Sequence, residues 1–285
     1  MLLLNHNPIY STIRDIMNFN SGMELEYTDL TGRLVLVTGE ITDTCFQTCL
    51  LLTKMSCKLV LANSNKQETL QTIKKLKSLT LNDEIYYSYL NFNNFSNIKQ
   101  FIQKFSNSIQ RLDILINFGC YCEGFDITED KYEFNLQWNY LGNVVLSLGL
   151  VPILKNTKGS RIINVVSNTD FKIGRIGKNI DFRQCNINNY RSTKEHSRVN
   201  YYIKLFTRSL SRKLEGISVI CVNSGLQSTN FNNTIQGATG GNLISGGYYD
   251  KYGKLDQTSI QVQSDELEDE LFEHTLKELI GNLDN

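Results

Sequence analysis

The sequence predicts an α/β fold built on a doubly wound parallel sheet, and three observations favour it. Short β-branched runs alternate with helical patterns from residue 33 onward, as in repeated strand–helix–strand units. The runs are apolar almost throughout, which is typical of strands covered on both faces. A glycine turn, Thr38-Gly39, follows the first strand and precedes a helix, where such folds bind phosphate. Together these features predict the strand order 3-2-1-4-5-6, with helices on both faces of the sheet.

Each strand is predicted from a short run rich in Val, Ile, Leu or Tyr. The expected strands are Leu34–Thr38, Lys58–Ala62, Glu84–Leu90, Leu112–Asn117, Arg161–Ser167 and Ser218–Val222.

The helices are predicted between these strands from helical periodicity, and one more follows the last strand. The expected helices are 43–55, 66–78, 95–109, 128–155, 190–215 and 264–281. Residues 1–29 are expected to form an N-terminal extension, and residues 30–285 a single domain. Within that domain the Gly- and Asn-rich segment 230–247 predicts a loop.

Composition excludes several classes of function. The 285 residues include 29 basic and 29 acidic side chains, so no positive excess is present to hold a nucleic-acid backbone. The longest apolar stretch, Val144–Leu154, is about half as long as a bilayer span. The apolar start Met1–Leu4 is too short for a signal-peptide core. We therefore expect no nucleic-acid partner, no membrane span and a cytoplasmic location.

The seven cysteines predict free thiols and no metal site. Their number is odd, and no CxxC pair occurs. Cys45-x3-Cys49 and Cys120-x-Cys122 lack a second ligand pair at metal-binding spacing.

Several segments resemble the short-chain dehydrogenase/reductases, a family with a Rossmann-type fold. They are DLTGRLVLVTG, RLDILIN-FG, ITEDKYEFNLQWNYLGN, SRIINVVS and LFTRSLSRKLEG, and together they are typical of the retinol-dehydrogenase-like branch. The resemblance runs from about Asp29 to Thr229 and includes part of the tail. It implies an NAD(P) cofactor, a hydrophobic alcohol or carbonyl substrate, and a shortened substrate-side region after Thr229.

The cofactor loop departs from the family pattern TGxxxGxG. Thr38 and Gly39 match, but Asp43 and Cys45 stand where the second and third glycines belong. Glycine lets the backbone approach the phosphates, whereas a carboxylate about 4 Å from a phosphate costs roughly 4 kcal/mol at an effective dielectric of 20. Asp43 can also cap its own helix. We therefore expect NAD(P) to bind weakly, if at all.

The other cofactor positions are carried over from the resemblance. Asn91 stands where the family has an adenine-contacting Asp, and Thr229 matches the nicotinamide-contacting threonine. Asn117 and Gly119 remain from the NNAG motif, which is one residue short. Ala62-Asn63-Ser64 supplies neither an acid nor an arginine to select a ribose.

Two catalytic pairs are compatible with the sequence. Ser167 and Asn139 match the family's serine and asparagine. Tyr190 and Lys194 fit YxxxK literally. Counting back from Thr207 in the LFTR segment, however, places His196 and Asn200 at the tyrosine and lysine positions.

Two functional hypotheses follow. The altered loop and catalytic pair favour a non-catalytic or weakly active binding or scaffold protein, that is, a pseudoenzyme. The alternative is a divergent NAD(P)-dependent oxidoreductase acting on a hydrophobic alcohol or carbonyl compound. By analogy with the family, a homodimer and a small hydrophobic ligand are also expected.

Overall fold

The structure is a computed structural model that describes residues 27–119, 124–167, 180–224, 232–241, 243–250, 253–256 and 265–281. Its centre is a seven-stranded sheet in which every paired strand is parallel, with the order β3-β2-β1-β4-β5-β6-β7. The predicted fold class and the order 3-2-1-4-5-6 are thus confirmed, with a short seventh strand added. The strands are β1 (Leu34–Gly39), β2 (Lys58–Asn63), β3 (Ile85–Tyr89), β4 (Ile114–Phe118), β5 (Arg161–Val166), β6 (Ser218–Asn223) and β7 (Tyr248–Tyr249).

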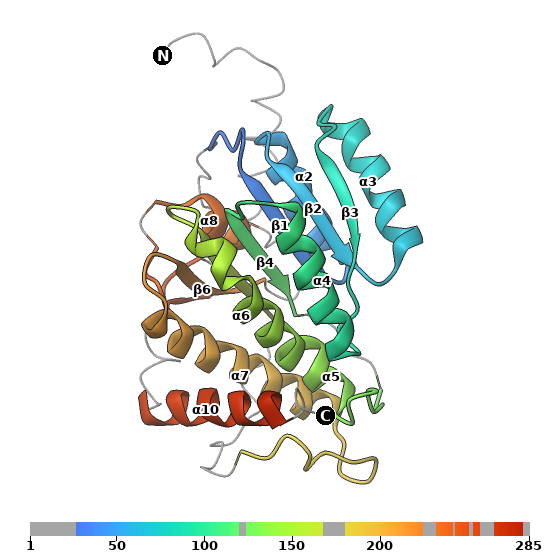
Figure 1. Cartoon of the computed structure of the whole chain (residues 1–285), viewed down its shortest axis with the longest axis vertical. Helices are drawn as coiled ribbons and strands as arrows, with labels where there is room; N and C mark the ends of the chain where they lie inside the picture. The colour runs from blue at the N-terminus through green and yellow to red at the C-terminus, as the bar shows by residue number, and fades with distance from the viewer. Residues whose placement is uncertain are drawn as a thin grey trace.

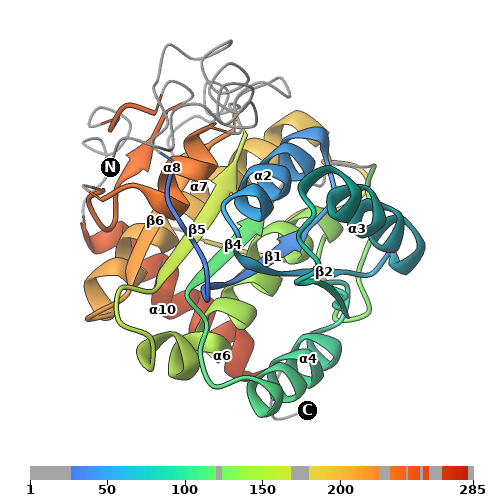
Figure 2. The same ribbon diagram turned by 90° about the horizontal axis from the view of Figure 1, so that it is seen from above.

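Helices cover both faces of the sheet (Figures 1 and 2). Their bounds are α2 (Asp43–Lys54), α3 (Lys66–Thr80), α4 (Phe95–Ser108), α5 (Phe134–Leu136), the π-helical turn η1 (Gln137–Leu141), α6 (Gly142–Lys155), α7 (Ser192–Lys213), α8 (Asn232–Thr239) and α10 (Asp265–Gly281).

The apolar core forms one layer on each side of the sheet. Leu36 and Leu115 belong to the layer beneath α4, α6 and α7, whereas Val37 and Ile116 belong to the layer beneath α2, α3 and α8. Successive residues of one strand therefore enter opposite layers, because side chains alternate across a strand. Burial on both faces explains why the strands read as continuous apolar runs.

The C-terminal helix α10 lies along α7 (Figure 1). Phe272 stacks on Phe206 with ring centroids 5.9 Å apart. Glu268, fully buried, pairs with Arg208 and Arg212 of α7. This contact closes the layer beneath α7 and buries part of that helix.

Two sequence predictions were wrong in detail. The segment 230–247 is not a continuous loop, because Asn232–Thr239 form α8 and bury Ile235 and Ala238 against the sheet. The predicted helix 128–155 begins only at Phe134. Before it, the chain turns at Lys131, whose φ is +68°, and Glu133 accepts hydrogen bonds from the amides that open α5.

None of the described helices combines the length and apolar character that crossing a bilayer requires. The predicted N-terminal extension falls almost wholly outside the described residues.

Candidate active site

The predicted site residues gather at the carboxyl edge of the sheet. Since the strands are parallel, their carboxyl ends share one edge, where open α/β folds bind ligands. Thr38 and Gly39 end β1, Asn117 lies near the end of β4, and Ser167 directly follows β5.

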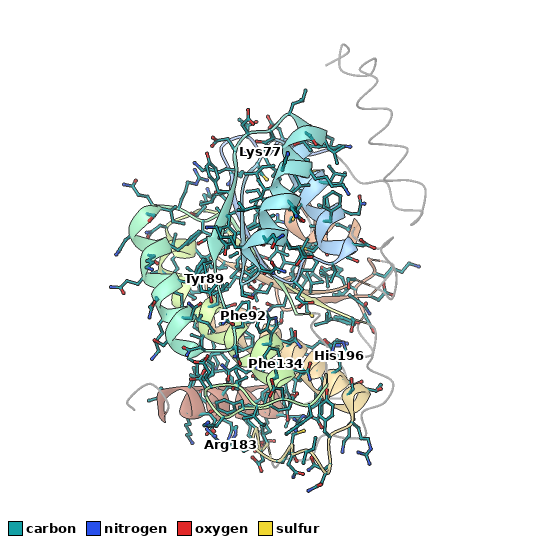
Figure 3. All side chains as sticks on the ribbon, turned by 90° about the vertical axis from the view of Figure 1, so that its right-hand side faces the viewer. Lys77, Tyr89, Phe92, Phe134, Arg183 and His196 are labelled. Atoms are coloured by element: carbon teal, nitrogen blue, oxygen red, sulfur yellow. The ribbon has the colours of Figure 1, made fainter. Side chains whose placement is uncertain are left out.

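Ser167 is contacted by two side chains of α7. His196 Nε2 lies 2.6 Å from Ser167 Oγ, and Asn200 Nδ2 donates to the same oxygen at 3.0 Å. Residues four apart share one face of a helix, so a single register of α7 presents both to the strand end. The two residues counted back from Thr207 therefore both lie beside Ser167, and Figure 3 locates His196 on α7.

His196 is a neutral, buried group in this arrangement. Its side chain is 8% exposed, and burial lowers its pKa. Within the described part of the chain, Nδ1 has no hydrogen-bond partner. No carboxylate of the described segments therefore fixes the imidazole tautomer, in contrast to a serine-hydrolase triad.

Tyr190 occupies a different environment. It precedes α7, accepts a hydrogen bond from Asn135 Nδ2 at 3.0 Å, and packs edge-on against Phe125. Lys194, in the first turn of α7, is exposed. The geometry thus brings His196 and Asn200 to Ser167 and gives Tyr190 a structural role at the start of the helix.

Asn139 lies in the π-helical turn η1 and is buried. Its carbonyl oxygen accepts a hydrogen bond from Asn143 Nδ2 at 2.9 Å. A Cβ added at Gly119 would lie 3.3 Å from that oxygen, so the two residues face one another. Both line a cavity of about 10 Å³, which is the size of one water molecule.

Thr38 and Asn117 belong to a buried polar network, which sequence reasoning missed. Thr38 Oγ1 donates to Asn117 Oδ1 at 3.1 Å, and Asn117 Nδ2 donates to Asn164 Oδ1 at 3.0 Å. Asn164 in turn donates to Thr207 of α7 at 2.9 Å, and Ser147 also bonds Asn117. The network ties three strands to α6 and α7. Asn164 stands inside the apolar run RIINVV, and this polar residue in a buried strand was the sequence feature that indicated such a network.

Gly39 is held in a conformation that requires glycine. Its φ is +99°, and a Cβ there would lie 2.1 Å from the Phe118 carbonyl oxygen. Asn63 Nδ2 donates to the Gly39 carbonyl at 2.6 Å. Asn63 therefore positions the loop, a contact that the sequence did not reveal.

The first turn of α2 differs from the expected arrangement. Thr42, not Asp43, caps the helix, because Thr42 Oγ1 accepts from the Cys45 amide at 3.2 Å. Asp43 is the first helical residue and is exposed. Its carboxylate remains available at the helix N-terminus, where a phosphate would otherwise bind.

The remaining predicted positions divide into two groups. Asn91 Oδ1 accepts from the Asn93 amide at 2.9 Å and so stabilises the turn after β3. Thr229, Cys120 and Cys122 lie outside the described residues. Over the described ranges, no group of three or more His, Cys, Asp or Glu side chains could hold a metal ion.

Comparison with known proteins identifies the family. The profile of the short chain dehydrogenase family matches residues 33–239. The chain belongs to the short-chain dehydrogenase family. Human retinol dehydrogenase 13 is 31% identical over 192 residues, which are 66% of this chain and 56% of that protein. Human polyprenol dehydrogenase is 27% identical over 187 residues, 64% of this chain and 56% of that protein. This short-chain dehydrogenase thus spans little more than half the length of these relatives.

Solved structures agree on the fold. An uncharacterized protein from Mycobacterium paratuberculosis superposes with a TM-score of 0.74 at 17% identity, covering 89% of this chain and 95% of that one. NADH-dependent reductase A1-R′, solved in complex with NAD, has a TM-score of 0.63 at 14% identity, covering 80% and 98%.

A nicotinamide dinucleotide is the cofactor that this family implies, but the loop of this short-chain dehydrogenase suits it poorly. Gly39 retains the close backbone approach to β4. Asp43, however, presents a carboxylate where the pyrophosphate would meet the start of α2. The Thr42 hydroxyl also occupies the Cys45 amide, one of the donors at that helix end. The turn therefore retains its shape, but it carries a carboxylate at the start of α2.

Proposed function

We propose that this short-chain dehydrogenase is a non-catalytic or weakly active member of its family that keeps the fold as a binding or scaffold protein. The observation that carries the proposal is the environment of Ser167. Its hydroxyl meets an imidazole and an amide, from His196 and Asn200, where the family resemblance expects a tyrosine and a lysine.

The chemical argument concerns charge. In the family a lysine ammonium lowers the pKa of the catalytic tyrosine and holds the ribose. Asn200 is neutral and cannot do either. His196 is buried, and burial lowers its pKa, so the pair supplies no positive charge at neutral pH.

Weak binding of NAD(P) is the second part of the proposal. It is supported by Asp43 at the first residue of α2 and by the absence of a charged side chain in Ala62-Asn63-Ser64. Asn63 is turned inward to the Gly39 carbonyl.

A divergent oxidoreductase acting on a hydrophobic alcohol or carbonyl compound is the second candidate. The 2.6 Å contact between His196 Nε2 and Ser167 Oγ favours it. A neutral imidazole beside a hydroxyl can accept a proton from a substrate oxygen or return one. Ser167 would then orient that oxygen.

The cellular setting and the partners are also proposals. The free, buried cysteines 45, 49, 57 and 185 support a reducing compartment such as the cytoplasm. A homodimer and a small hydrophobic ligand are supported by the family resemblance. Since α10 packs along α7, α10 covers part of the helix that such an interface would use.

Calorimetric titration of the full chain with NADH and NADPH tests the proposal. We expect dissociation constants in the millimolar range, and no turnover of retinoid or other hydrophobic alcohols above that of His196→Gln. The oxidoreductase alternative replaces the proposal if binding is micromolar and turnover is lost in His196→Gln but kept in Tyr190→Phe.

A further inference from the structure

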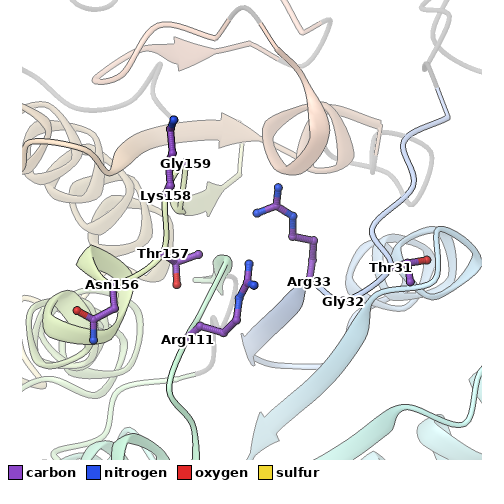
Figure 4. Close-up of a pocket in the computed structure, with 8 residues that line it drawn as sticks. All are labelled: Thr31, Gly32, Arg33, Arg111, Asn156, Thr157, Lys158 and Gly159. Carbon is purple, nitrogen blue, oxygen red and sulfur yellow. The ribbon is translucent and has the colours of Figure 1, made fainter.

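A cationic cavity opens at the amino edge of the sheet, opposite the candidate active site. Its volume is about 740 Å³, within the range of small-molecule sites. Three separate segments line it (Figure 4): the turn Thr31–Arg33 before β1, Arg111 before β4, and the turn Asn156–Gly159 between α6 and β5. A six-residue strand is about 20 Å long, so this cavity is distinct from the dinucleotide loop at the other edge.

Cations outnumber carboxylates in this cavity. Arg33, Arg111 and Lys158 line it, with the buried carboxylate of Asp113 beside them and the exposed carboxylate of Asp29 bonded to Thr31 at its edge. Arg33 Nη1 contacts Asp113 Oδ1 at 2.7 Å, and Arg111 Nε contacts Oδ2 at 3.1 Å. Two carboxylates cannot neutralise three cations, so the cavity keeps an excess of positive charge.

Both carboxylate oxygens of Asp113 accept hydrogen bonds in this arrangement. Burial opposes its ionisation, but hydrogen bonds from Arg111 and Arg33 outweigh burial and hold the pKa of the carboxyl below its usual value. Oδ2 also accepts the Leu34 amide at 2.9 Å. The carboxylate therefore orients the two guanidinium groups and fixes them at the cavity.

Donors remain available to a ligand. The side chains of Arg33 and Arg111 are 46% and 52% exposed, and each guanidinium has more N–H groups than Asp113 accepts. The Thr157 hydroxyl is buried at the cavity wall and has no hydrogen-bond partner within the described residues. Figure 4 shows Arg33 and Arg111 extending into the same space from two different segments.

A second cavity continues the positive surface. It measures about 280 Å³, shares Arg33 and Lys158 with the first, and adds Arg161. Burial, followed by the charge of Arg33, lowers the pKa of Arg161, as expected where cations crowd. Asp29, an exposed carboxylate that lines this second cavity, accepts hydrogen bonds from the amide and the hydroxyl of Thr31.

We propose that this cavity, formed by Arg33, Arg111, Lys158 and Thr157, binds the phosphate groups of a small polyanion. Two fixed guanidinium forks match phosphate oxygens, and Lys158 adds a mobile point charge. The proposal is independent of whether the other edge of the sheet binds a cofactor.

Calorimetric titration of the full chain with inorganic pyrophosphate tests the proposal. Lys158→Glu is the informative variant because Lys158 is exposed and its ammonium pairs with no side chain of the described residues. Lys155→Glu is the matched control: it makes the same charge change three residues earlier, and Lys155 does not line the cavity. We expect Lys158→Glu to weaken binding at least tenfold, Lys158→Ala to weaken it less, and Lys155→Glu to change it less than threefold.

The outcomes separate the alternatives. Equal losses in the two lysine-to-glutamate variants would show general charge screening, and no loss in either would place pyrophosphate elsewhere; both overturn the proposal. Co-sedimentation with phosphatidic acid vesicles, compared with phosphatidylcholine vesicles, distinguishes a lipid headgroup from a free phosphate compound. Sedimentation that depends on Lys158 but not on Lys155 assigns the site to a lipid phosphate. Absence of both pyrophosphate and vesicle binding also overturns the proposal.

Discussion

His196 Nε2 lies 2.6 Å from Ser167 Oγ, across the junction between α7 and the end of β5. This contact defines the register of α7 at the candidate site. It also places a titratable ring, mostly buried, beside a hydroxyl that Asn200 contacts as well. Protonation of His196 therefore affects both the site and the free energy of unfolding.

The first prediction concerns the pH dependence of stability. Burial lowers the pKa of folded His196 below the unfolded value of about 6.5, so the unfolded chain binds the proton more tightly. The contribution of neutral His196 to the free energy of unfolding is fully present above about pH 6.5 and is lost as the pH falls through the folded pKa. His196→Gln removes this dependence. Urea unfolding between pH 7 and 5 should show the wild type losing more stability than the variant.

Tyr190→Phe is the control for that measurement. It removes the hydroxyl that accepts from Asn135 Nδ2, but this amide still donates to Glu133 Oε1 at 2.6 Å. We expect a loss of about 1 kcal/mol or less, with the pH dependence of the wild type. A pH profile altered by Tyr190→Phe and not by His196→Gln would contradict this assignment.

The second prediction concerns the loop after β1. Gly39→Ala places a Cβ 2.1 Å from a backbone oxygen of β4 at a φ of +99°. Neither strand can move without breaking the parallel pairing of β1 and β4. We expect a loss of about 3 kcal/mol or more, measured by chemical denaturation. Gly124→Ala, where no atom lies within 4 Å of the new Cβ, should change stability by less than about 1 kcal/mol. Comparable losses in the two variants would show that the close approach at Gly39 is relaxed.

The third prediction concerns the contact between α10 and α7. Glu268 is fully buried and pairs with Arg208 and Arg212, so Glu268→Gln removes the buried anion that both guanidinium groups share. Asp265 and Asp269 still pair with them at the helix surface. Because both arginines are partly exposed, we expect a loss of about 2 kcal/mol in thermal or urea unfolding. Glu270→Gln changes an exposed residue of the same helix and should be nearly neutral. An unchanged midpoint for Glu268→Gln would mean that the ion pairs of Asp265 and Asp269 and the apolar contacts suffice to hold α10.

The sequence predicted those features that depend on local pattern or fixed spacing. The central strands were predicted from apolar runs because both of their faces are covered, whereas the edge strand β3 leaves Tyr86 and Tyr89 exposed. The choice of His196 followed from the family resemblance, which fixes the distance between the catalytic position and Thr207, and a helix keeps such a distance as a fixed rotation. Strand order followed from the known topology of alternating strands and helices.

Features that depend on tertiary contact were missed. Helix α8 has weak local helical character, and Ile235 and Ala238 become helical because the sheet buries them. Gly237 permits a close approach, since a Cβ there would lie 2.9 Å from Ile220. The network from Thr38 through Asn117 and Asn164 joins residues far apart in sequence, so no local pattern could reveal it.

The last prediction separates the cofactor loop from the catalytic pair. His196→Tyr with Asn200→Lys should not restore NADH binding, because Asp43 still presents a carboxylate at the start of α2. Asp43→Gly with Cys45→Gly removes that charge and should tighten NADH binding at least tenfold, since two charges about 4 Å apart interact by roughly 1 kcal/mol in water and more in a cleft. Asp83→Asn, an exposed carboxylate elsewhere, controls for net charge. Calorimetric titration of the three variants with NADH measures these changes in affinity. If the tyrosine–lysine pair alone restores micromolar binding, the loop adapts to the pyrophosphate and the loss lies in the catalytic pair instead.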